Sequence, residues 1–404
     1  MKKIITAIDV GTTKICTIVG TLDSGGGIQV LGVGFVPSRG LHKGMVVNVD
    51  EAKDTIAESI KRAEQASGVR VESAFVGVTG RHIHSTNTHG VVAIPRNDRL
   101  VRSDDLKRVL DSAQHVNIPD DRKVLHAIPR HYNLDNQERI KNPVGMHGFR
   151  LDVETHVITA AVASIQNLVK CIRSVGVEIA DLILEPLASG ESVLTTEEKE
   201  LGVILADIGG GTTDIAVFKD GSIYHTSIVP VAGYQVTSDL SIGLGLPFDI
   251  AEAMKKKYGN VSPDLITKSE DSTLNIENGH SVSYRDLCKI IQDRIEELLR
   301  LILLEMPDSN YNSLAPAGLV LSGGGAKLVG IEALARTTLR IPCRIGQPMG
   351  VYGITDILHD PSQATGVGLL LWGVRNQGKP AWESSKKGGS MGGFVSLLKK
   401  FFGI

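Results

Sequence analysis

The chain has 404 residues, enough for two to four domains, and 42% of them are hydrophobic, enough to bury sizeable cores. Its 43 basic and 45 acidic side chains nearly balance, which excludes the strong basic excess of a nucleic-acid-binding protein. The four cysteines are far apart and form no CxxC pair, and no run of about 18 apolar residues occurs, so neither a disulfide framework, a structural zinc site nor a membrane span is expected.

The first predicted feature is a polar turn between two short apolar strands. The strands are expected at Ile4–Val10 and Ile15–Gly20, and the turn reads Asp-Val-Gly-Thr-Thr-Lys over Asp9–Lys14. A helix with apolar residues at helical spacing is expected over Glu51–Ser67, with Gly68 as its C-terminal stop. A further strand is expected over Glu72–Thr79.

The texture of the sequence changes over residues 83–163, where charges and prolines separate short strands. Strands are expected at Lys123–Ile128 and Arg150–Ala160, and an amphipathic helix at Ser103–His115 with Ser103 as its N-cap. This stretch is predicted to be a small α+β subdomain inserted into the first half of the chain. A helix at Ser164–Val175 and a strand at Asp181–Leu184 return the chain to the first core.

The opening turn is repeated about 200 residues later. Gly202–Ile208 and Ile215–Phe218 are the expected strands, and Asp207–Asp214 is the turn, which reads Asp-Ile-Gly-Gly-Gly-Thr-Thr-Asp. Two matched turns at half-chain spacing indicate an internal duplication with one copy in each of two lobes. The alternative is a pair of unrelated hairpins.

The second half continues with mostly helical patterns. The elements expected there are a helical stretch over Val236–Tyr258 broken by Gly243, Gly245 and Pro247, a loop with a short hairpin over 259–283, a long amphipathic helix over Ser283–Glu305, a strand over Leu319–Leu321 and a helix over Gln363–Val374. Residues 375–393 read as a linker of Gly, Ser and Lys.

The two turns have the chemistry of a phosphate site. Glycine lets the backbone approach phosphate oxygens closely, and successive amide N–H groups cradle an anion. An Asp at the end of each strand is suited to hold a magnesium ion through water, which predicts Asp9 and Asp207 as metal-binding residues. No GxxxxGK[ST] sequence occurs, so this is not a Walker-type site.

Six segments resemble the motifs of the actin/Hsp70/sugar-kinase superfamily over roughly residues 4–373. Asp9–Lys14 and Asp207–Asp214 resemble its two phosphate motifs. The others are the first connecting motif at Leu184–Gly190, the helix that holds ribose and purine at Ala251–Lys256, the adenosine motif at Gly318–Gly330 and, in addition, the second connecting helix at Ala364–Gly373. The resemblance implies an α/β, actin-like two-lobed ATPase fold of duplicated RNase H-like domains that binds ATP and Mg²⁺.

The resemblance also implies roles for particular residues. Those of the phosphate turns are Gly11, Thr12, Thr13, Lys14, Gly209, Gly210, Gly211, Thr212 and Thr213. Those elsewhere in the nucleotide site are Gly233, Glu252, Lys255, Lys256, Gly323, Gly324, Gly325 and Lys327. Glu252 and Lys255 are three apart and share one side of a helix. Glu185 would position the metal-bound water, and Asp207 would help to hold the metal. The resemblance implies at most slow ATP hydrolysis.

The placement of the insert resembles the FtsA family of bacterial cell division proteins. Three further segments do so as well: Gly40–Val49, Gly77–Gly80 and Ala232–Leu246. Tyr234 is a departure, since a smaller polar residue is expected there. The resemblance implies self-assembly into filaments, binding of the C-terminal tail peptide of FtsZ on the small subdomain of the second lobe, and recruitment of later division proteins at the membrane.

The last eleven residues form an independent amphipathic pattern. On a helical wheel, one half carries Phe394, Val395, Leu397, Leu398, Phe401, Phe402 and Ile404, and the other carries Lys399 and Lys400. An apolar face backed by lysines on a Gly-rich tether predicts an interfacial anchor and therefore a peripheral membrane protein. The resemblance to the FtsA family implies that it lies on the cytoplasmic face of the cell membrane at the division site. A terminal helix docked on the fold is the alternative.

These patterns predict a division of the chain into six parts. They are 1–82, 164–196 and 346–374 for the first-lobe core, 83–163 for the insert, 197–236 and 306–345 for the second-lobe core, 237–305 for its small subdomain, 375–393 for the linker and 394–404 for the tail helix. Two other functions remain open at this point: a pilus-assembly ATP-binding protein, and a small-molecule kinase of the same fold with Asp214 as the acceptor-activating carboxylate.

Overall fold

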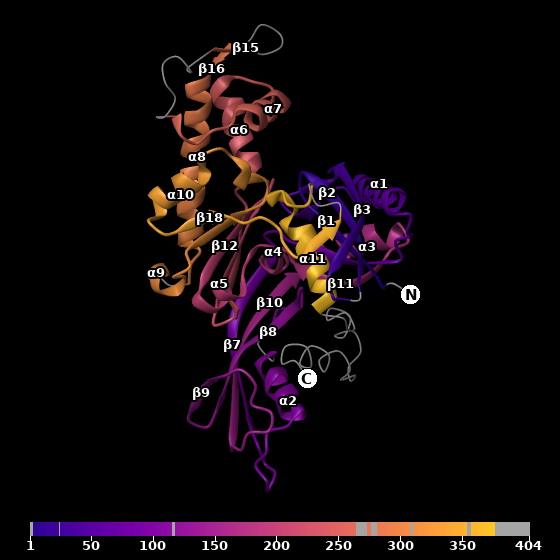
Figure 1. The fold of residues 1–404 in the computed structure, drawn as a ribbon, viewed down its shortest axis with the longest axis vertical. Coiled ribbons are helices and arrows are strands. Elements are labelled where there is room, and N and C mark those ends of the chain that lie inside the picture. The colour runs from indigo at the N-terminus through magenta and orange to yellow at the C-terminus, as the bar shows by residue number, and fades with distance from the viewer. Residues whose placement is uncertain are drawn as a thin grey trace.

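The computed structural model describes residues 3–23, 25–114, 118–263, 273–275, 281–307, 310–353 and 357–375. Figure 1 shows two lobes side by side, a helical subdomain at one end of the molecule and a sheet subdomain at the other. The expected tail helix, with the predicted membrane residues, lies outside the described residues, as does the expected linker beyond Arg375.

Both lobes are built on the same five-strand arrangement. The first sheet has the order β11-β6-β1-β2-β3-β19 and the second β14-β13-β12-β17-β18. The strands of the first are β1 (Lys3–Val10), β2 (Lys14–Leu22), β3 (Ile28–Pro37), β6 (Ser73–Val78), β11 (Glu178–Leu184) and β19 (Val351–Gly353). Those of the second are β12 (Val203–Ile208), β13 (Thr213–Lys219), β14 (Ser222–Val229), β17 (Leu319–Ser322) and β18 (Cys343–Ile345).

The pairing of the strands also matches between the lobes. In each, the first three strands pair antiparallel in sequence order, while the fourth pairs parallel with the first and the fifth parallel with the fourth. The same order and the same directions in two halves of one chain confirm the predicted duplication and exclude a pair of unrelated hairpins.

Four helices pack on the first sheet, and one of them, α4, also contacts the second: α1 (Val49–Ser67), α3 (Val162–Ser174), α4 (Glu185–Val193) and α11 (Ala364–Arg375). The α1 helix ends at Gly68 in the left-handed conformation, as predicted. The two connecting helices pack unusually closely, since a Cβ on Gly368 of α11 would lie 1.8 Å from the carbonyl oxygen of Ala188 in α4. This close approach brings the hydroxyl oxygens of Ser189 and Thr365 to 3.0 Å from each other between the lobes.

The insert is a sheet of its own with the order β7-β10-β8-β9, and one helix lies against it. Its elements are β7 (Ile83–Ala93), α2 (Ser103–Gln114), β8 (Arg122–Leu134), β9 (Gln137–Ile140) and β10 (Arg150–Ala161). Leu106, Val109 and Leu110 of α2 join a separate hydrophobic core. The predicted α+β insert is therefore confirmed.

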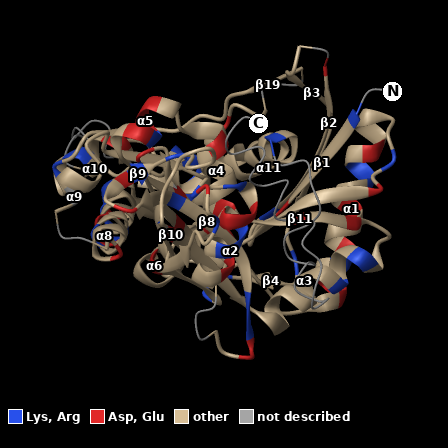
Figure 2. Ribbon diagram, turned by 90° about the horizontal axis from the view of Figure 1, so that it is seen from below, with Lys and Arg blue, Asp and Glu red and all other residues tan. Residues whose placement is uncertain are grey.

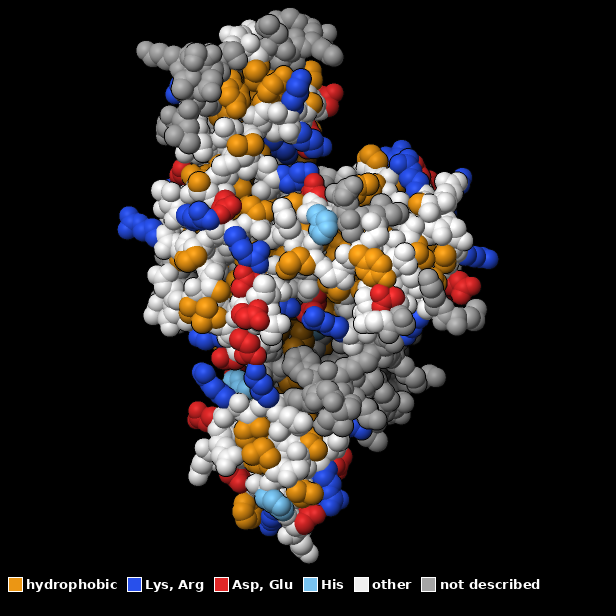
Figure 3. Space-filling view, in the orientation of Figure 1, with side chains coloured by type: hydrophobic (Ala, Val, Ile, Leu, Met, Phe, Trp, Pro, Cys, Tyr) orange, Lys and Arg blue, Asp and Glu red, His pale blue; other side chains and the backbone are white. Residues whose placement is uncertain are grey.

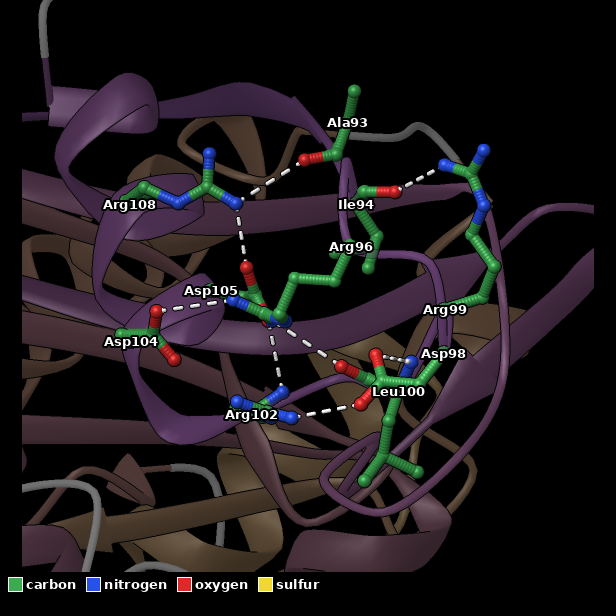
Figure 4. Close-up of polar contacts among 10 residues, drawn as sticks. All are labelled: Ala93, Ile94, Arg96, Asp98, Arg99, Leu100, Arg102, Asp104, Asp105 and Arg108. Carbon is green, nitrogen blue, oxygen red and sulfur yellow. Dashed lines mark hydrogen bonds and ion pairs between the residues drawn. The ribbon is translucent and has the colours of Figure 1, made fainter.

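A buried carboxylate fixes the start of α2 (Figure 4). Asp105 is fully buried, forms ion pairs with Arg96 and Arg108, and accepts the backbone N–H of Arg102 at 2.9 Å. Ser103 is already helical, so its prediction as the N-cap was wrong. The third helical residue instead satisfies the N–H before the helix, which is one half of a capping box.

The small subdomain of the second lobe consists of α6 (Gly233–Leu244), α7 (Phe248–Tyr258), α8 (Tyr284–Leu304) and a hairpin of β15 (Thr273–Asn275) and β16 (Ser281–Ser283). Gly245 adopts a φ of 65° at the end of α6, so the break in the helical pattern is where the sequence predicts it. The remaining elements are β4 (Leu41–His42), β5 (Met45–Val46), α5 (Thr196–Leu201), α9 (Tyr311–Leu314), α10 (Ile331–Leu339) and the short 3₁₀ segments η2 (Gly324–Lys327) and η3 (Pro361–Gln363).

The insert touches the second lobe as well as the first. The Ser85 hydroxyl donates to the Thr226 carbonyl at 2.8 Å, and His156 bonds the Thr226 hydroxyl at 2.9 Å. The guanidinium of Arg130 lies 4.0 Å from the centre of the Tyr224 ring. Burial lowers the pKa of His156 to about 3, so this contact contains a neutral imidazole at physiological pH.

Charges of both signs are distributed along the ribbon and over the face seen in the space-filling view (Figures 2 and 3). This mixture agrees with the near balance of the composition. None of the described helices is long and apolar enough to cross a membrane.

Candidate functional site

The two glycine-threonine turns have the same hydrogen-bonded form. The Gly11 N–H donates to the Lys14 carbonyl at 3.0 Å, and the Gly209 N–H donates to the Thr212 carbonyl at 2.9 Å. The strand registers pair Asp9 with Cys16 and Asp207 with Asp214. Lys14 is therefore equivalent to Thr212, and Cys16 to Asp214. The Thr-Thr pair of the second turn is therefore shifted by two residues relative to the Thr-Thr pair of the first turn when the two turns are aligned.

The turns face each other across the lobes and are in contact. A Cβ on Gly210 would lie 2.2 Å from Cγ2 of Thr13, and a Cβ on Gly211 would lie 2.7 Å from Oγ1 of Thr12. Side chains at either glycine would push the lobes apart. The structure thus brings together the two sets of backbone N–H groups that the sequence predicts as phosphate donors.

Four carboxyl groups are buried beneath the turns. They belong to Asp9, Glu185, Asp207 and Asp214. Burial raises the pKa of all four, to about 6 for Asp9 and about 8 for Asp214, and neighbouring carboxylates add to the effect at Asp9, Glu185 and Asp214. Lys14 lowers the pKa of Asp9, Glu185 and Asp207, because its positive charge favours the ionised carboxylates.

Hydroxyl groups hold two of these carboxylates in place. Ser189 donates to Oδ2 of Asp207 at 2.5 Å and Thr365 does so at 3.3 Å, while Thr79 donates to Oδ1 of Asp214 at 2.5 Å. Oε1 of Glu185 is buried without a hydrogen-bond partner. A buried carboxylate oxygen without a donor, beside three other acids, is suited to face a hydrated cation.

The arrangement fits a cation held through water rather than by direct ligation. Across the described ranges, no three His, Cys, Asp or Glu side chains are grouped tightly enough to hold an ion directly. Magnesium commonly keeps several of its waters and binds through one or two carboxylates, so Asp9 and Asp207 remain suitable for that role.

The raised pKa of Asp214 predicts a pH-dependent stability. The folded protein holds a proton on Asp214 up to about pH 8, whereas an unperturbed aspartate in the unfolded chain releases its proton near pH 3.8. The stabilisation this proton provides is therefore complete below about pH 4 and is lost as the pH rises to about 8. Relative to the parent protein, Asp214→Asn is expected to become more stable over this window, by up to about 1.4 kcal/mol per pH unit.

Urea unfolding without nucleotide or metal, at several pH values between about 5 and 8, measures this difference. The exposed Asp54→Asn serves as the control and should run parallel to the parent. Parallel curves for Asp214→Asn would show that the pKa of the buried carboxyl is not raised.

Helix α6 begins directly on the second turn, and the predicted ribose and purine helix, which lies in α7, reaches the start of α6 through Lys255. The N–H groups of Gly233 and Tyr234, at the start of α6, donate to the carbonyls of Gly209 at 3.1 Å and Gly210 at 2.7 Å. Nζ of Lys255 lies 2.9 Å from the Gly233 carbonyl and 2.6 Å from Oε2 of Glu252. Glu252 and Lys255 thus share one helix side, as predicted, and Lys256 pairs with Glu252 from an exposed position at 3.1 Å.

The Gly323–Gly325 segment lies directly on the second-lobe turn. Gly323 has a φ of 80°, and a Cβ there would lie 2.3 Å from Oδ1 of Asp207. A Cβ on Gly324 would make only an ordinary contact of 4.0 Å with the Cβ of Ser362, while a Cβ on Gly325 would lie 2.2 Å from Cγ2 of Ile208. Lys327 is half-exposed and forms an ion pair with Asp360.

The η3 segment was not predicted as part of the site. The Gly323 N–H donates to the Pro361 carbonyl at 3.1 Å, and the Lys14 ammonium donates to the Ser362 carbonyl. This segment therefore ties the adenosine motif to the first-lobe turn. Thr79, Ser189 and Thr365 were also missed, although each lies in a segment whose resemblance to a family motif was recognised.

Two lobes of one strand order, with acidic glycine turns facing each other, define an actin-like fold. A solved structure described as a "PilM-PilN type IV pilus biogenesis complex" matches with a TM-score of 0.65 at 16% identity, covering 92% of this chain and 98% of that chain. MreB5 of Spiroplasma citri bound to ADP matches with a TM-score of 0.54 at 14% identity, and the match covers 92% of this chain and 96% of that chain. At these identities the likeness shows the fold alone.

The chain belongs to the FtsA family of cell division proteins. The family model described as "Cell division protein FtsA" matches residues 204–368, and that described as "SHS2 domain inserted in FTSA" matches residues 80–159. FtsA of Pseudomonas aeruginosa is 45% identical over 93% of this chain and 90% of its own length. FtsA of Escherichia coli K12 is 34% identical over 99% of this chain and 97% of its own length. These matches confirm the resemblance seen in the sequence.

Proposed function

We propose that this protein is an ATP-binding, actin-like tether that attaches FtsZ polymers to the cytoplasmic face of the cell membrane at the division site. The single observation that supports nucleotide binding is the contact between the two glycine turns above four buried carboxyl groups. ATP bridging both turns would favour the closed arrangement of the lobes and a conformation able to assemble into filaments. The neighbouring folds described as bound to ADP and to AMPPNP support a nucleotide in this cleft.

A magnesium ion would neutralise the phosphate oxygens, and Asp9 and Asp207 are the residues that would hold it through water. The Ser189 and Thr365 hydroxyls fix the orientation of Asp207. Glu185 would orient the attacking water from the start of α4. Burial and the neighbouring acids raise the pKa of Glu185 well above its usual range, and a bound cation would lower it again by favouring the ionised carboxylate. We infer that any ATP hydrolysis at this site is slow.

The two competing functions have less support. The pilus-assembly function rests on a likeness in fold at 16% identity, whereas the FtsA relatives reach 45%. The kinase function needs Asp214 to receive a proton from an acceptor hydroxyl. Both oxygens of Asp214 accept threonine hydroxyls instead, Oδ1 from Thr79 at 2.5 Å and Oδ2 from Thr212 at 3.5 Å.

Membrane attachment is assigned to the last eleven residues on the basis of their sequence pattern. The FtsZ tail peptide is assigned to the small subdomain over 237–305, in which α8 exposes Arg300 and half-buries Arg294, both in ion pairs with neighbouring acids. Later division proteins would join the assembly at the membrane.

Vesicle pelleting tests the proposal as a whole. The full-length protein is mixed with anionic vesicles, with and without ATP and magnesium, and with a labelled FtsZ tail peptide. The peptide is expected to pellet only with vesicles and protein together. If the protein pellets with the vesicles but the peptide never does, the proposed tether function is wrong.

A further inference from the structure

The β4–β5 hairpin lies over the point where the two turns meet. The Gly44 N–H, at its tip, donates to Oγ1 of Thr12 in the first turn at 3.0 Å. The Cα of Lys43 lies 3.0 Å from the position that a Cβ on Gly211 of the second turn would take. A two-residue hairpin tip therefore contacts both lobes.

A side chain of the second lobe also packs against this hairpin. The ring of His42 lies edge-on to that of Tyr234 in α6, with centroids 5.8 Å apart, and the Tyr234 ring packs on Phe248 at 4.9 Å. Tyr234 is the residue at which the sequence departs from the expected small polar side chain. Its backbone N–H bonds Gly210, so the same residue supports the second turn and the hairpin.

Lys43 occupies this tip at a conformational cost. Its φ is 47° and that of Gly44 is 73°, the left-handed pair required by a tight hairpin turn. A non-glycine residue with such a φ is uncommon and is mildly strained. Within the described ranges, the half-buried Lys43 side chain has no ion pair or hydrogen bond with another residue. Neither its conformation nor an internal partner explains a lysine at this position.

The charge balance of the cleft leaves a place for a second cation. The one lysine beside the buried carboxyl groups is Lys14, whose ammonium is engaged by the Ser362 carbonyl and lies 5.7 Å from the centre of the Phe35 ring, so it is not free to follow a bound phosphate chain. A triphosphate brings further negative charge to the same space. Cations positioned around phosphoryl oxygens are the usual means of stabilising such charge.

We propose that Lys43 is a phosphate-binding residue, supplied by the β4–β5 hairpin from above the two turns. The extended side chain spans about 6 Å, which reaches an anion cradled by the amides of the Gly209–Thr212 turn. Lys43 then contributes more to the binding of a nucleoside triphosphate than to that of a monophosphate, and the His42–Tyr234 contact holds the hairpin in position. This inference rests on the proposed binding of ATP in the cleft.

Isothermal titration of the full-length protein with ATP, ADP and AMP, each with magnesium, tests the inference. The variant is Lys43→Asn, because asparagine tolerates the left-handed conformation and carries no charge. Its affinity for ATP is expected to fall by about tenfold to a hundredfold, in line with the loss of a hydrogen bond between charged groups, with a smaller fall for ADP and little change for AMP.

Arg340→Asn is the matched control, since Arg340 is an exposed basic residue with a φ of 55° at the end of α10, in the second lobe. It should leave all three affinities unchanged, and thermal melting should show Lys43→Asn to be folded. An unchanged ATP affinity in a folded Lys43→Asn protein overturns the assignment of Lys43. A parent protein that binds none of the three nucleotides overturns the proposed function instead.

Discussion

A protein carrying Lys14→Ala together with Gly210→Val is expected to lose ATP binding by more than about a hundredfold, since a bond between charged groups contributes about 1.5–3 kcal/mol and the second change removes the site's geometry as well. Lys14 is the cation among the four buried acids and spans to the Ser362 carbonyl. A valine Cβ at position 210 would lie 2.2 Å from Cγ2 of Thr13, so the turns could not meet. Titration with ATP and magnesium measures the loss.

The control for this pair is Lys61→Ala with Gly25→Val. Lys61 is an exposed residue of α1, and a Cβ on Gly25 would make only an ordinary contact of 3.4 Å with Asp23. The control should bind ATP like the parent. Circular dichroism of the test variant must show a folded protein. A folded test variant with the parent's ATP affinity would refute the placement of the phosphate site.

Deletion of residues 392–404 is expected to release the protein from anionic vesicles almost completely. The deleted segment carries the apolar half-wheel, and its two lysines contribute about 1 kcal/mol each near an anionic surface. The segment is too short to form a stable helix alone in water, so its ordering depends on the lipid. Pelleting with anionic vesicles measures binding, and ATP titration should give an unchanged affinity.

A full-length variant with Phe401→Glu and Phe402→Glu separates the tail's apolar face from its length. It should behave like the deletion, whereas Ser396→Ala should bind like the parent, because Ser396 falls on the half of the helical wheel that carries Lys399 and Lys400. Retention of the deletion protein on vesicles would show that the membrane contact lies elsewhere in the chain, and the anchor assignment would fail.

The elements with a strong local signal could be predicted from the sequence. The α1 helix ends at Gly68, and the helical stretch after the second turn breaks at Gly245, because left-handed positions select glycine. Strands β3 and β14 were not predicted. Each pairs antiparallel with the strand directly before it through a short connection, and β3 alternates buried and partly buried side chains, so a local signal was present and was overlooked. Strand β19 is different, because it is three residues long and pairs with β3 from more than 300 positions away, which no local pattern indicates.

The site was predicted where backbone chemistry defines it and missed where side chains from other segments complete it. Glycines and acids beside strands were recognisable because few other residues fit those positions. Thr79, Ser189 and Thr365 are ordinary hydroxyl residues whose role comes from their distance to Asp207 and Asp214. The repeat is real, but its two Thr-Thr pairs are not equivalent. The strand registers instead make Thr12 and Thr13 equivalent to Gly210 and Gly211.

The insert has a mechanical consequence because it contacts both lobes. Its strands β7 and β10 continue from the first lobe, while Ser85 and His156 bond Thr226 in the outer strand of the second. A rotation of one lobe against the other must therefore shear this contact or carry the insert with it. Since the insert projects away from the cleft toward α2 (Figure 1), a small rotation at the nucleotide becomes a larger displacement at its far end. As long as the Thr226 contact holds, the far end of the insert would move furthest when the cleft opens or closes.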